Sequence, residues 1–244
     1  MKVFYEQLAD RSRRRFALLI DPDKYDDDSL KILLGHVNQD APDLLLVGGS
    51  ILFKPIDLTV TTLKLCTSIP VFLFPGNVMQ LSDRADGILF LSLLSGRNAE
   101  FLIGNHVLAA PHLERAGIEV IPTGYMLIEN GHSTSVEYMS NTRPIPYGKT
   151  EIAVATAMAG EMLGMRSIYL EAGSGAANPV GLDMIEAIRA KISLPLIVGG
   201  GITSVNRARE VYGAGADMIV VGTVVEQQPE LVREFAALRD ELNK

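Results

Sequence analysis

Ser167-Ile-Tyr-Leu-Glu-Ala-Gly-Ser-Gly175, Pro195-Leu-Ile-Val-Gly-Gly-Gly-Ile202 and Asp217-Met-Ile-Val-Val-Gly-Thr-Val224 are the stretches that decide the fold. Each is a short apolar run that ends in a glycine-rich turn. Glycine after a buried strand lets backbone N–H groups converge on a bound anion, because no Cβ stands in the way. The last two turns lie where a (β/α)8 barrel binds phosphate. We therefore expect a phosphorylated small molecule at one end of such a barrel.

The alternation of apolar strand and helix extends through the whole chain. Strands are predicted at residues 16–20, 43–47, 71–74, 87–91, 119–123, 167–170, 196–198 and 218–221. Helical patterns are predicted at residues 27–38, 57–68, 99–116, 150–163, 182–192, 205–212 and 229–242. Eight parallel strands joined by right-handed crossovers predict an α/β fold, a TIM barrel that forms a single domain over residues 1–244. A doubly wound open sheet is the structural alternative.

The third unit of this barrel departs from the pattern. Its segment Pro75-Gly-Asn-Val-Met-Gln-Leu-Ser-Asp-Arg84 is too short for a full outer helix. A barrel with a short or missing third helix has a groove in its wall that could hold a long ligand. The longest irregular segment, residues 129–147, follows the fifth strand, and its composition fits a lid, an assembly surface or a solvated connector equally.

Composition narrows the class of protein. The formal net charge of −7 over 244 residues argues against a general surface for nucleic acid or for an anionic membrane. The only cysteine, Cys66, excludes an intrachain disulfide and is expected to be buried and inert. No signal peptide is visible, and no apolar run approaches the ~20 residues that span a bilayer. The chain is therefore predicted to be cytoplasmic.

Two neighbouring strand ends carry candidate metal ligands. The first strand ends in Ile20-Asp-Pro22, where Asp21 either caps the turn that follows or binds Mg²⁺, a hard cation held by carboxylates and substrate phosphate. The second strand ends in Gly48-Gly-Ser50, whose hydroxyl could complete a metal or phosphate site opposite Asp21.

The sixth strand carries the candidate catalytic pair. Tyr169 and Glu171 alternate with Leu170, so both are predicted to face the barrel interior or its mouth. A buried glutamate is costly unless it is paired. Either a substrate hydroxyl or a structural arginine would satisfy it.

Taken together, these turns resemble one family. The sequences Asp21-Pro-Asp-Lys, Gly48-Gly-Ser, Gly124-Tyr, Tyr169-Leu-Glu-Ala-Gly-Ser-Gly, Gly199-Gly-Gly-Ile and Val221-Gly-Thr are similar to those of the geranylgeranylglyceryl phosphate synthase family, which includes the heptaprenylglyceryl phosphate synthases. The resemblance implies a modified TIM barrel and a Mg²⁺-dependent prenyltransferase. Its substrates would be sn-glycerol 1-phosphate and geranylgeranyl diphosphate or a related prenyl diphosphate. The prenyl group would move to the glycerol 3-hydroxyl, giving an ether-lipid precursor and diphosphate.

The resemblance also implies roles for individual residues. The family's metal ligands fall on Asp21 and Ser50. Glu171 would orient the glycerol hydroxyl and accept its proton, Tyr169 would position the reactants, and Tyr125 would line the path of the prenyl chain. The glycerol-phosphate contacts fall on Tyr169, Leu170, Glu171, Ala172, Gly173, Ser174, Gly175, Gly200, Gly201, Gly222 and Thr223.

The sequence also leads to expectations about three phenylalanines, about assembly and about competing functions. Phe53, Phe72 and Phe74 are expected to pack in the core, although they could also line the groove. A homo-oligomer, either a dimer or a hexamer, and transient membrane contact through the amphiphilic product are expected. The competing enzyme class is a phosphosugar isomerase or lyase of amino-acid or thiamine biosynthesis. That class would need a second aspartate after the fifth strand, where this chain has Thr123-Gly-Tyr125. A non-catalytic phosphate- or lipid-binding protein is the other alternative.

Overall fold

Eight parallel strands close into a barrel in the order β1-β2-β3-β4-β5-β6-β7-β8, and β8 pairs with β1. The structure is a computed structural model that describes residues 3–244. The predicted TIM barrel is therefore confirmed, and the open sheet is excluded. The strands are β1 (Arg15–Ile20), β2 (Leu44–Val47), β3 (Val71–Leu73), β4 (Gly87–Leu93), β5 (Glu119–Leu127), β6 (Ser167–Glu171), β7 (Leu196–Gly199) and β8 (Met218–Val221).

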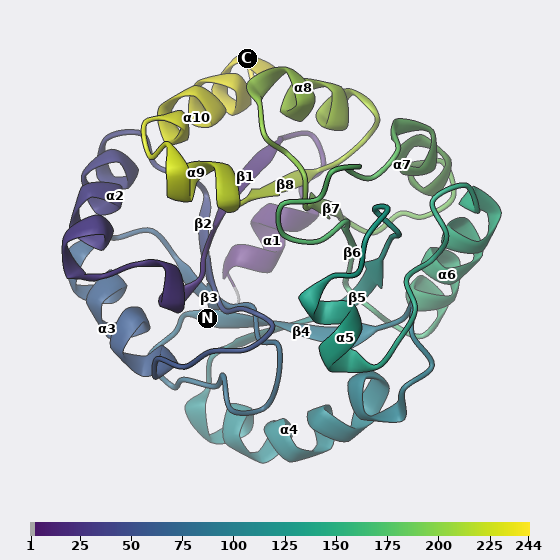
Figure 1. The fold of residues 1–244 in the computed structure, drawn as a ribbon, viewed down its shortest axis with the longest axis horizontal. Coiled ribbons are helices and arrows are strands. Elements are labelled where there is room, and N and C mark those ends of the chain that lie inside the picture. Colours follow the sequence, from purple (N-terminus) through teal and green to yellow (C-terminus); the bar gives the residue numbers. More distant parts are fainter. Residues whose placement is uncertain (1–2) are drawn as a thin grey trace.

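Helices surround this barrel (Figure 1). The long ones lie where the sequence predicts them, apart from shifts at their ends. The sequence does not predict the short helices α1, α5 and α9, because they are shorter than the roughly 11 residues over which helical periodicity can be recognised. The helices are α1 (Val3–Ala9), α2 (Asp27–Gln39), α3 (Ile56–Cys66), α4 (Asn105–Ala116), α5 (Ser135–Ser140), α6 (Thr150–Met162), α7 (Leu182–Arg189), α8 (Val205–Gly213), α9 (Thr223–Gln227) and α10 (Leu231–Leu242), with a 3-10 turn η1 (Pro22–Lys24) and a π-helical turn η2 (Glu100–Gly104).

The helix of the third β/α unit, which would follow β3, is missing, as predicted; helix α3 follows β2 and belongs to the second unit. Between β3 and β4 the described chain forms only turns and bends, and Figure 1 shows a loop where the other units place a helix. In the next unit, η2 leads directly into α4, so one continuous helical segment borders this gap.

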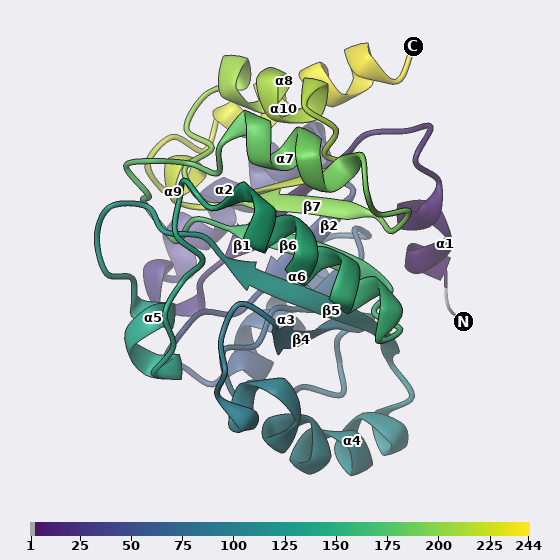
Figure 2. The ribbon, with the colours of Figure 1, turned by 90° about the vertical axis from the view of Figure 1, so that its right-hand side faces the viewer.

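Helix α1 closes the barrel at the amino ends of the strands. Phe4 and Leu8 are buried and belong to the cluster that fills the barrel interior. The carboxylate of Glu119, at the start of β5, accepts hydrogen bonds from the backbone N–H groups of Phe4 (3.1 Å) and Tyr5 (2.9 Å). Figure 2 shows α1 at one end of the molecule and α5 and α9 at the other. The open mouth is therefore the end that carries the predicted site.

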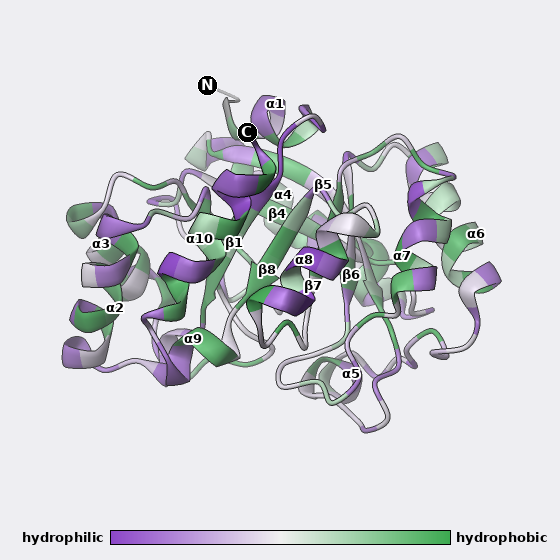
Figure 3. Ribbon diagram, turned by 90° about the horizontal axis from the view of Figure 1, so that it is seen from above, coloured by the Kyte–Doolittle hydropathy of each residue, from purple (hydrophilic) through white to green (hydrophobic). Residues whose placement is uncertain are grey.

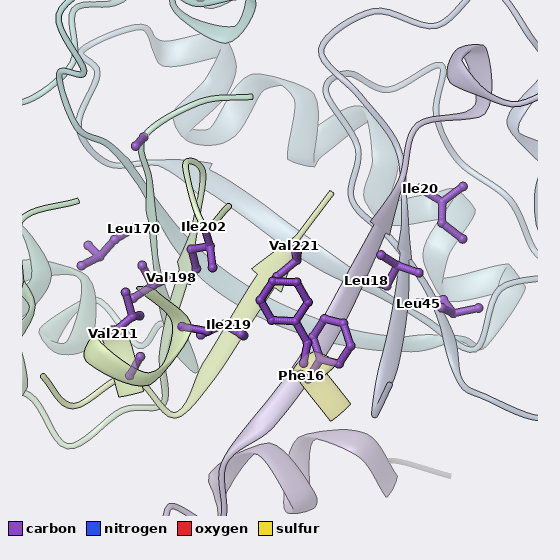
Figure 4. Packing of buried hydrophobic residues seen from close by; sticks show 14 of the residues in the cluster. Phe16, Leu18, Ile20, Leu45, Leu170, Val198, Ile202, Val211, Ile219 and Val221 are labelled. Atoms are coloured by element: carbon purple, nitrogen blue, oxygen red, sulfur yellow. The ribbon is translucent and has the colours of Figure 1, made fainter. Parts of the chain in front are cut away.

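The core follows the alternation of the strands. Every second residue along a strand points into the barrel interior, as Leu46, Phe72 and Met218 do. The residues between them point outward and pack against the helices. Figure 4 shows Phe16 and Val221 of this outer layer, which come from the paired strands β1 and β8. Polar residues gather on the outer faces of the helices, and apolar residues dominate the strands (Figure 3).

Two expectations about single side chains are wrong. Cys66 is exposed, because it is the last residue of α3 and lies on the solvent side of that helix. Phe53 is 86% exposed on the loop between β2 and α3, whereas Phe72 and Phe74 are buried in the barrel as expected. Among residues 3–244, no helix is both long and apolar enough to cross a bilayer.

Candidate active site

The loops after β1 and β2 bring Asp21 and Ser50 into one region of the mouth. The Asp21 Oδ1 atom accepts a hydrogen bond from the Asp23 N–H (3.0 Å) and so caps η1. Its Oδ2 atom faces the next loop, since a Cβ built on Gly49 would lie 3.4 Å from it. Partial burial raises the pKa of Asp21, against the opposing effect of the Asp23 N–H. One carboxylate oxygen thus has a structural role, while the other is directed towards the Gly49-Ser50 turn.

This donor set suits Mg²⁺. A carboxylate oxygen and a serine hydroxyl are hard ligands, and Mg²⁺ is commonly held by one or two carboxylates together with substrate phosphate. Within the described residues, no group of three or more His, Cys, Asp or Glu side chains could hold a metal without substrate. A metal at Asp21 and Ser50 would therefore depend on phosphate oxygens supplied by a ligand.

Glu171 ends β6 as a buried carboxyl group. Its Oε1 atom accepts a hydrogen bond from the Gly173 N–H (2.6 Å), and no arginine pairs with it among the described residues. Burial raises the pKa of Glu171 to about 7, although the Gly173 N–H and the adjacent Tyr169 hydroxyl favour the charged form. Among residues 3–244, no arginine pairs with Glu171 as the structural alternative required. The raised pKa of about 7 places the titration of Glu171 near neutral pH.

Tyr169 lies in the barrel interior, as its alternation with Leu170 predicts. Its ring lies 5.3 Å from that of Phe74 and 5.4 Å from that of Tyr125, measured between centroids. Its hydroxyl is buried and has no well-formed hydrogen bond to any described residue. Burial, and then the charge of Glu171, raises the pKa of Tyr169 well above its ordinary value. The Tyr169 hydroxyl is therefore neutral and can donate a hydrogen bond to an atom of a ligand.

The turns after β6, β7 and β8 meet at the mouth. A Cβ on Gly200 would overlap Glu171 Oε1, and a Cβ on Gly201 would lie 2.9 Å from the Pro179 side chain. The hydroxyl groups of Ser174 and Thr223 lie 2.9 Å apart and are on the exposed side of this cluster. The structure thus brings together the predicted phosphate-contacting turns, although they are distant in sequence.

A narrow apolar groove lies where the third helix is missing. It is enclosed between the loop after β3 and helix α4, and its volume is about 50 Å³. The ring of His106 lies at this groove, with its Nε2 atom 3.1 Å from the Ser92 hydroxyl, and burial lowers the pKa of His106. Tyr125 does not line the groove, but Leu91 and Phe101 do, and both also pack against the interior cluster that contains Tyr125. The lining residues are Pro75, Gly76, Asn77, Val78, Leu81, Ile88, Phe90, Leu91, Phe101, Asn105, His106 and Ala109.

Sequence reasoning missed two buried amides that support the mouth. Asn130 is 1% exposed, and its Nδ2 atom donates to the Ala172 carbonyl (2.5 Å), which joins the base of the irregular segment to the turn after β6. Gln80 is 3% exposed and contacts the loop after β2. Neither belongs to a recognisable motif, since both bind backbone atoms of distant segments.

A larger cavity, of about 430 Å³, opens near the other end of the barrel. It contains none of the predicted site residues, and its charged lining suits solvent better than a hydrocarbon chain. Its lining residues are Glu6, Gln7, Asp10, Arg13, Arg15 and Asp43.

Comparison with known proteins connects this geometry to one family. The PcrB family matches residues 9–239. The chain is 49% identical over 233 residues to the geranylgeranylglyceryl phosphate synthase of Spirosoma linguale, covering 95% of this chain and 94% of that protein. It is 41% identical to the enzyme of the same name from Korarchaeum cryptofilum, covering 97% and 98% of the two chains.

A solved structure gives the same result in three dimensions. The crystal structure of (S)-3-O-geranylgeranylglyceryl phosphate synthase from Thermoplasma acidophilum, in complex with its substrate sn-glycerol 1-phosphate, superposes with a TM-score of 0.91. The two chains are 31% identical, and the match covers 100% of this chain and 99% of that one.

Proposed function

This chain belongs to the PcrB family, and on that basis we propose that it transfers a geranylgeranyl or similar long prenyl group from its diphosphate to the 3-hydroxyl of sn-glycerol 1-phosphate. The observation that carries the proposal is Glu171, a buried carboxyl group with no cationic partner among the described residues and with its pKa raised to about 7. Such a group can accept a proton from a substrate hydroxyl near neutral pH.

The reaction then balances as follows. The glycerol 3-oxygen forms a bond to the allylic carbon, the bond from that carbon to diphosphate breaks, and the hydroxyl proton passes to Glu171. Tyr169 lies beside Glu171 with its hydroxyl buried, and this hydroxyl would help to orient the attacking oxygen. Holding the reacting atoms in this geometry lowers the entropic part of the barrier. Because the base must be charged, activity should rise with pH through about 7.

Asp21 and Ser50 would hold Mg²⁺ with the diphosphate of the prenyl substrate. A bound Mg²⁺ would neutralise the negative charge that develops on the leaving diphosphate. Asp21 has one carboxylate oxygen directed towards the Gly49-Ser50 turn, which fits this role. The other oxygen remains bound to the Asp23 N–H and fixes the direction of the side chain.

The phosphate of sn-glycerol 1-phosphate would bind at the turns after β6, β7 and β8. The hydroxyls of Ser174 and Thr223 lie 2.9 Å apart, close enough for both to contact one anion once their mutual hydrogen bond is exchanged for it. Backbone N–H groups of the same turns complete the proposed contacts, which are the set Tyr169, Leu170, Glu171, Ala172, Gly173, Ser174, Gly175, Gly200, Gly201, Gly222 and Thr223.

The prenyl chain would extend along the groove left by the missing helix. Leu91 and Phe101 join this groove to the interior aromatic residues, and Tyr125 would line the inner end of the path. At about 50 Å³ the groove is far smaller than an ordinary ligand cleft of ~300 Å³ or more, so the substrate must displace side chains or the loop after β3.

The remaining predictions concern the whole chain. We expect residues 1–244 to act as one prenyltransferase domain in the cytoplasm, in transient contact with a membrane when the amphiphilic product leaves. We also expect a homo-oligomer, a dimer or a hexamer, because η2 and α4 expose the apolar residues Ile103, Val107 and Leu108. Light scattering would measure the assembly, and a monomer would contradict this expectation.

The proposed reaction is tested by following radiolabelled sn-glycerol 1-phosphate into an organic phase. The assay contains Mg²⁺ and geranylgeranyl diphosphate, and parallel reactions contain sn-glycerol 3-phosphate or excess chelator. We expect transfer from the 1-phosphate only, and its loss with chelator and in Glu171→Gln. No transfer from any prenyl diphosphate of ~15 to ~35 carbons would refute the proposal and favour a phosphosugar isomerase or lyase.

A further inference from the structure

Gln80 lies in the loop that replaces the helix of the third unit, and its amide group binds the loop after β2 and the start of its own loop. Its Oε1 atom accepts hydrogen bonds from the N–H groups of Gly49 (3.3 Å) and Gly76 (3.1 Å). Its Nε2 atom donates to the Gly49 carbonyl (2.7 Å). The side chain is 3% exposed, so all three bonds are shielded from water.

The two loops that Gln80 joins are in direct backbone contact. A Cβ on Gly76 would overlap the Gly49 carbonyl oxygen and would lie 3.0 Å from the Ser50 Cα atom. Such an approach leaves little room for water, so the backbone groups of Gly49 and Gly76 need partners from the protein. Gln80 supplies these partners and thereby fixes the position of the residue before Ser50.

The same loop is held on its other side by Asp23. Its carboxylate accepts hydrogen bonds from the N–H groups of Phe53 (2.8 Å) and Lys54 (2.9 Å). Asp23 therefore fixes the end of the loop after Ser50, and Gln80 fixes the end before it. Ser50 therefore lies in a loop that is held on both sides, and the Asp21 carboxylate is directed towards the residue before it, Gly49.

We propose that Gln80 is a positioning residue that holds the Gly48-Gly49-Ser50 turn in the geometry needed to bind a metal-bound prenyl diphosphate. This inference rests on the proposed roles of Asp21 and Ser50. It gives the loop after β3 a second purpose: the segment that opens the groove also carries the side chain that supports the adjoining diphosphate site. Groups that orient a metal ligand in this way commonly alter affinity when they are removed.

The test compares ligand binding by the whole chain with that of Gln80→Met, which keeps the length of the side chain and removes its three hydrogen bonds. Calorimetric titration measures geranylgeranyl diphosphate with Mg²⁺, and separately sn-glycerol 1-phosphate. We expect the affinity for the diphosphate to fall by about 10- to 100-fold. We expect sn-glycerol 1-phosphate to bind unchanged, because its proposed site lies on β6 to β8. Hydrogen exchange should rise in residues 48–54 and at Gly76, and nowhere else.

Asn243→Ala is the matched control. Asn243 makes the same kind of paired contact, accepting from the Arg14 N–H (2.6 Å) and donating to the Arg14 carbonyl (3.0 Å), but near the start of β1. It should lower thermal stability without a selective loss of diphosphate binding. Should Gln80→Met fail to fold, Gln80→Glu, which keeps both acceptor contacts and loses the donor, undergoes the same titrations and exchange.

Each outcome decides the proposal. A selective loss of diphosphate binding supports it. Unchanged diphosphate binding, or an equal loss of both ligands with a stability loss like that of Asn243→Ala, overturns it and makes Gln80 a general structural residue. If the unaltered chain binds the diphosphate equally well with and without Mg²⁺, the proposed metal site fails first and this inference fails with it.

Discussion

At the scale of single residues, Glu171 couples catalysis to stability. Its pKa is about 7 in the folded chain against an ordinary value of 4.5, because burial disfavours the charged form. The folded state therefore retains a proton that the unfolded state has lost between these values. The associated stability is fully present below pH 4.5 and is lost as pH rises through about 7. The loss amounts to about 3 kcal/mol.

Glu171→Gln tests this linkage. The amide oxygen can still accept from the Gly173 N–H, but the side chain no longer titrates. We expect the variant to gain stability relative to the unaltered chain by about 3 kcal/mol on going from pH 4 to pH 8. Urea unfolding at several pH values measures the difference. A difference that does not vary with pH would show that Glu171 titrates normally in the folded chain.

Gly200 provides a second prediction at this scale. Its φ of +78° disfavours any side chain, and a Cβ would also overlap Glu171 Oε1. Gly164 has a similar φ of +88° but has no neighbouring atom within 4 Å of that Cβ. Gly164→Ala should therefore cost only about 1 kcal/mol of backbone strain. Gly200→Ala should in addition lower kcat, because its Cβ displaces Glu171. Steady-state kinetics measures kcat of both variants, and unfolding experiments measure their stability. Equal kcat values would contradict the expected contact.

The sequence predicts some of these residues and not others. Alternation along β6 places Tyr169 and Glu171 on one face, and the strand-end rule finds Asp21, because both follow from local backbone geometry. Gln80 and Asn130 act through backbone atoms 31 and 42 residues away. No local pattern encodes such contacts, so only the folded chain reveals them.

At the scale of elements, the missing helix of the third unit is predictable because the ten residues 75–84 must also form the turns that connect to both strands, which leaves too few for a full outer helix. Which helix borders the gap depends on tertiary packing. Ala109 of α4 is 5% exposed and lines the groove, whereas the next residue, Ala110, is exposed. Ala109→Phe should fill the groove and raise the KM for geranylgeranyl diphosphate by about tenfold or more. Ala110→Phe is the matched control and should leave that KM unchanged.

The KM for sn-glycerol 1-phosphate separates a local effect from a general one. It should be the same in both α4 variants, because the glycerol-phosphate turns belong to β6, β7 and β8 rather than to this helix. Ala109→Phe with an unchanged KM for the prenyl substrate would place the hydrocarbon chain elsewhere.

At the scale of the whole molecule, the two ends of the barrel have different tasks. At the closed end, Asp217 precedes β8 and is 1% exposed. Its carboxylate pairs with Arg189 (2.9 Å), Arg14 (3.4 Å) and Arg11 (3.6 Å), and it also accepts from the Leu196 N–H (2.8 Å). These contacts join the first strand to the last two. In TIM barrels this end contributes stability, whereas the opposite end carries the chemistry.

Asp217→Asn should therefore separate stability from function. The amide oxygen can still accept from the Leu196 N–H, but three arginines lose their counter-charge. The cost should be about 3–5 kcal/mol, as for other buried ion pairs that lose one partner. Glu241→Gln breaks an exposed pair with Arg209 and should cost less than about 1 kcal/mol. Below the unfolding temperature, both variants should keep the KM values of the unaltered chain. Thermal unfolding measures the loss of stability, and steady-state kinetics measures KM. A raised KM in Asp217→Asn would mean that closure of the barrel at β1 and β8 controls the shape of its mouth.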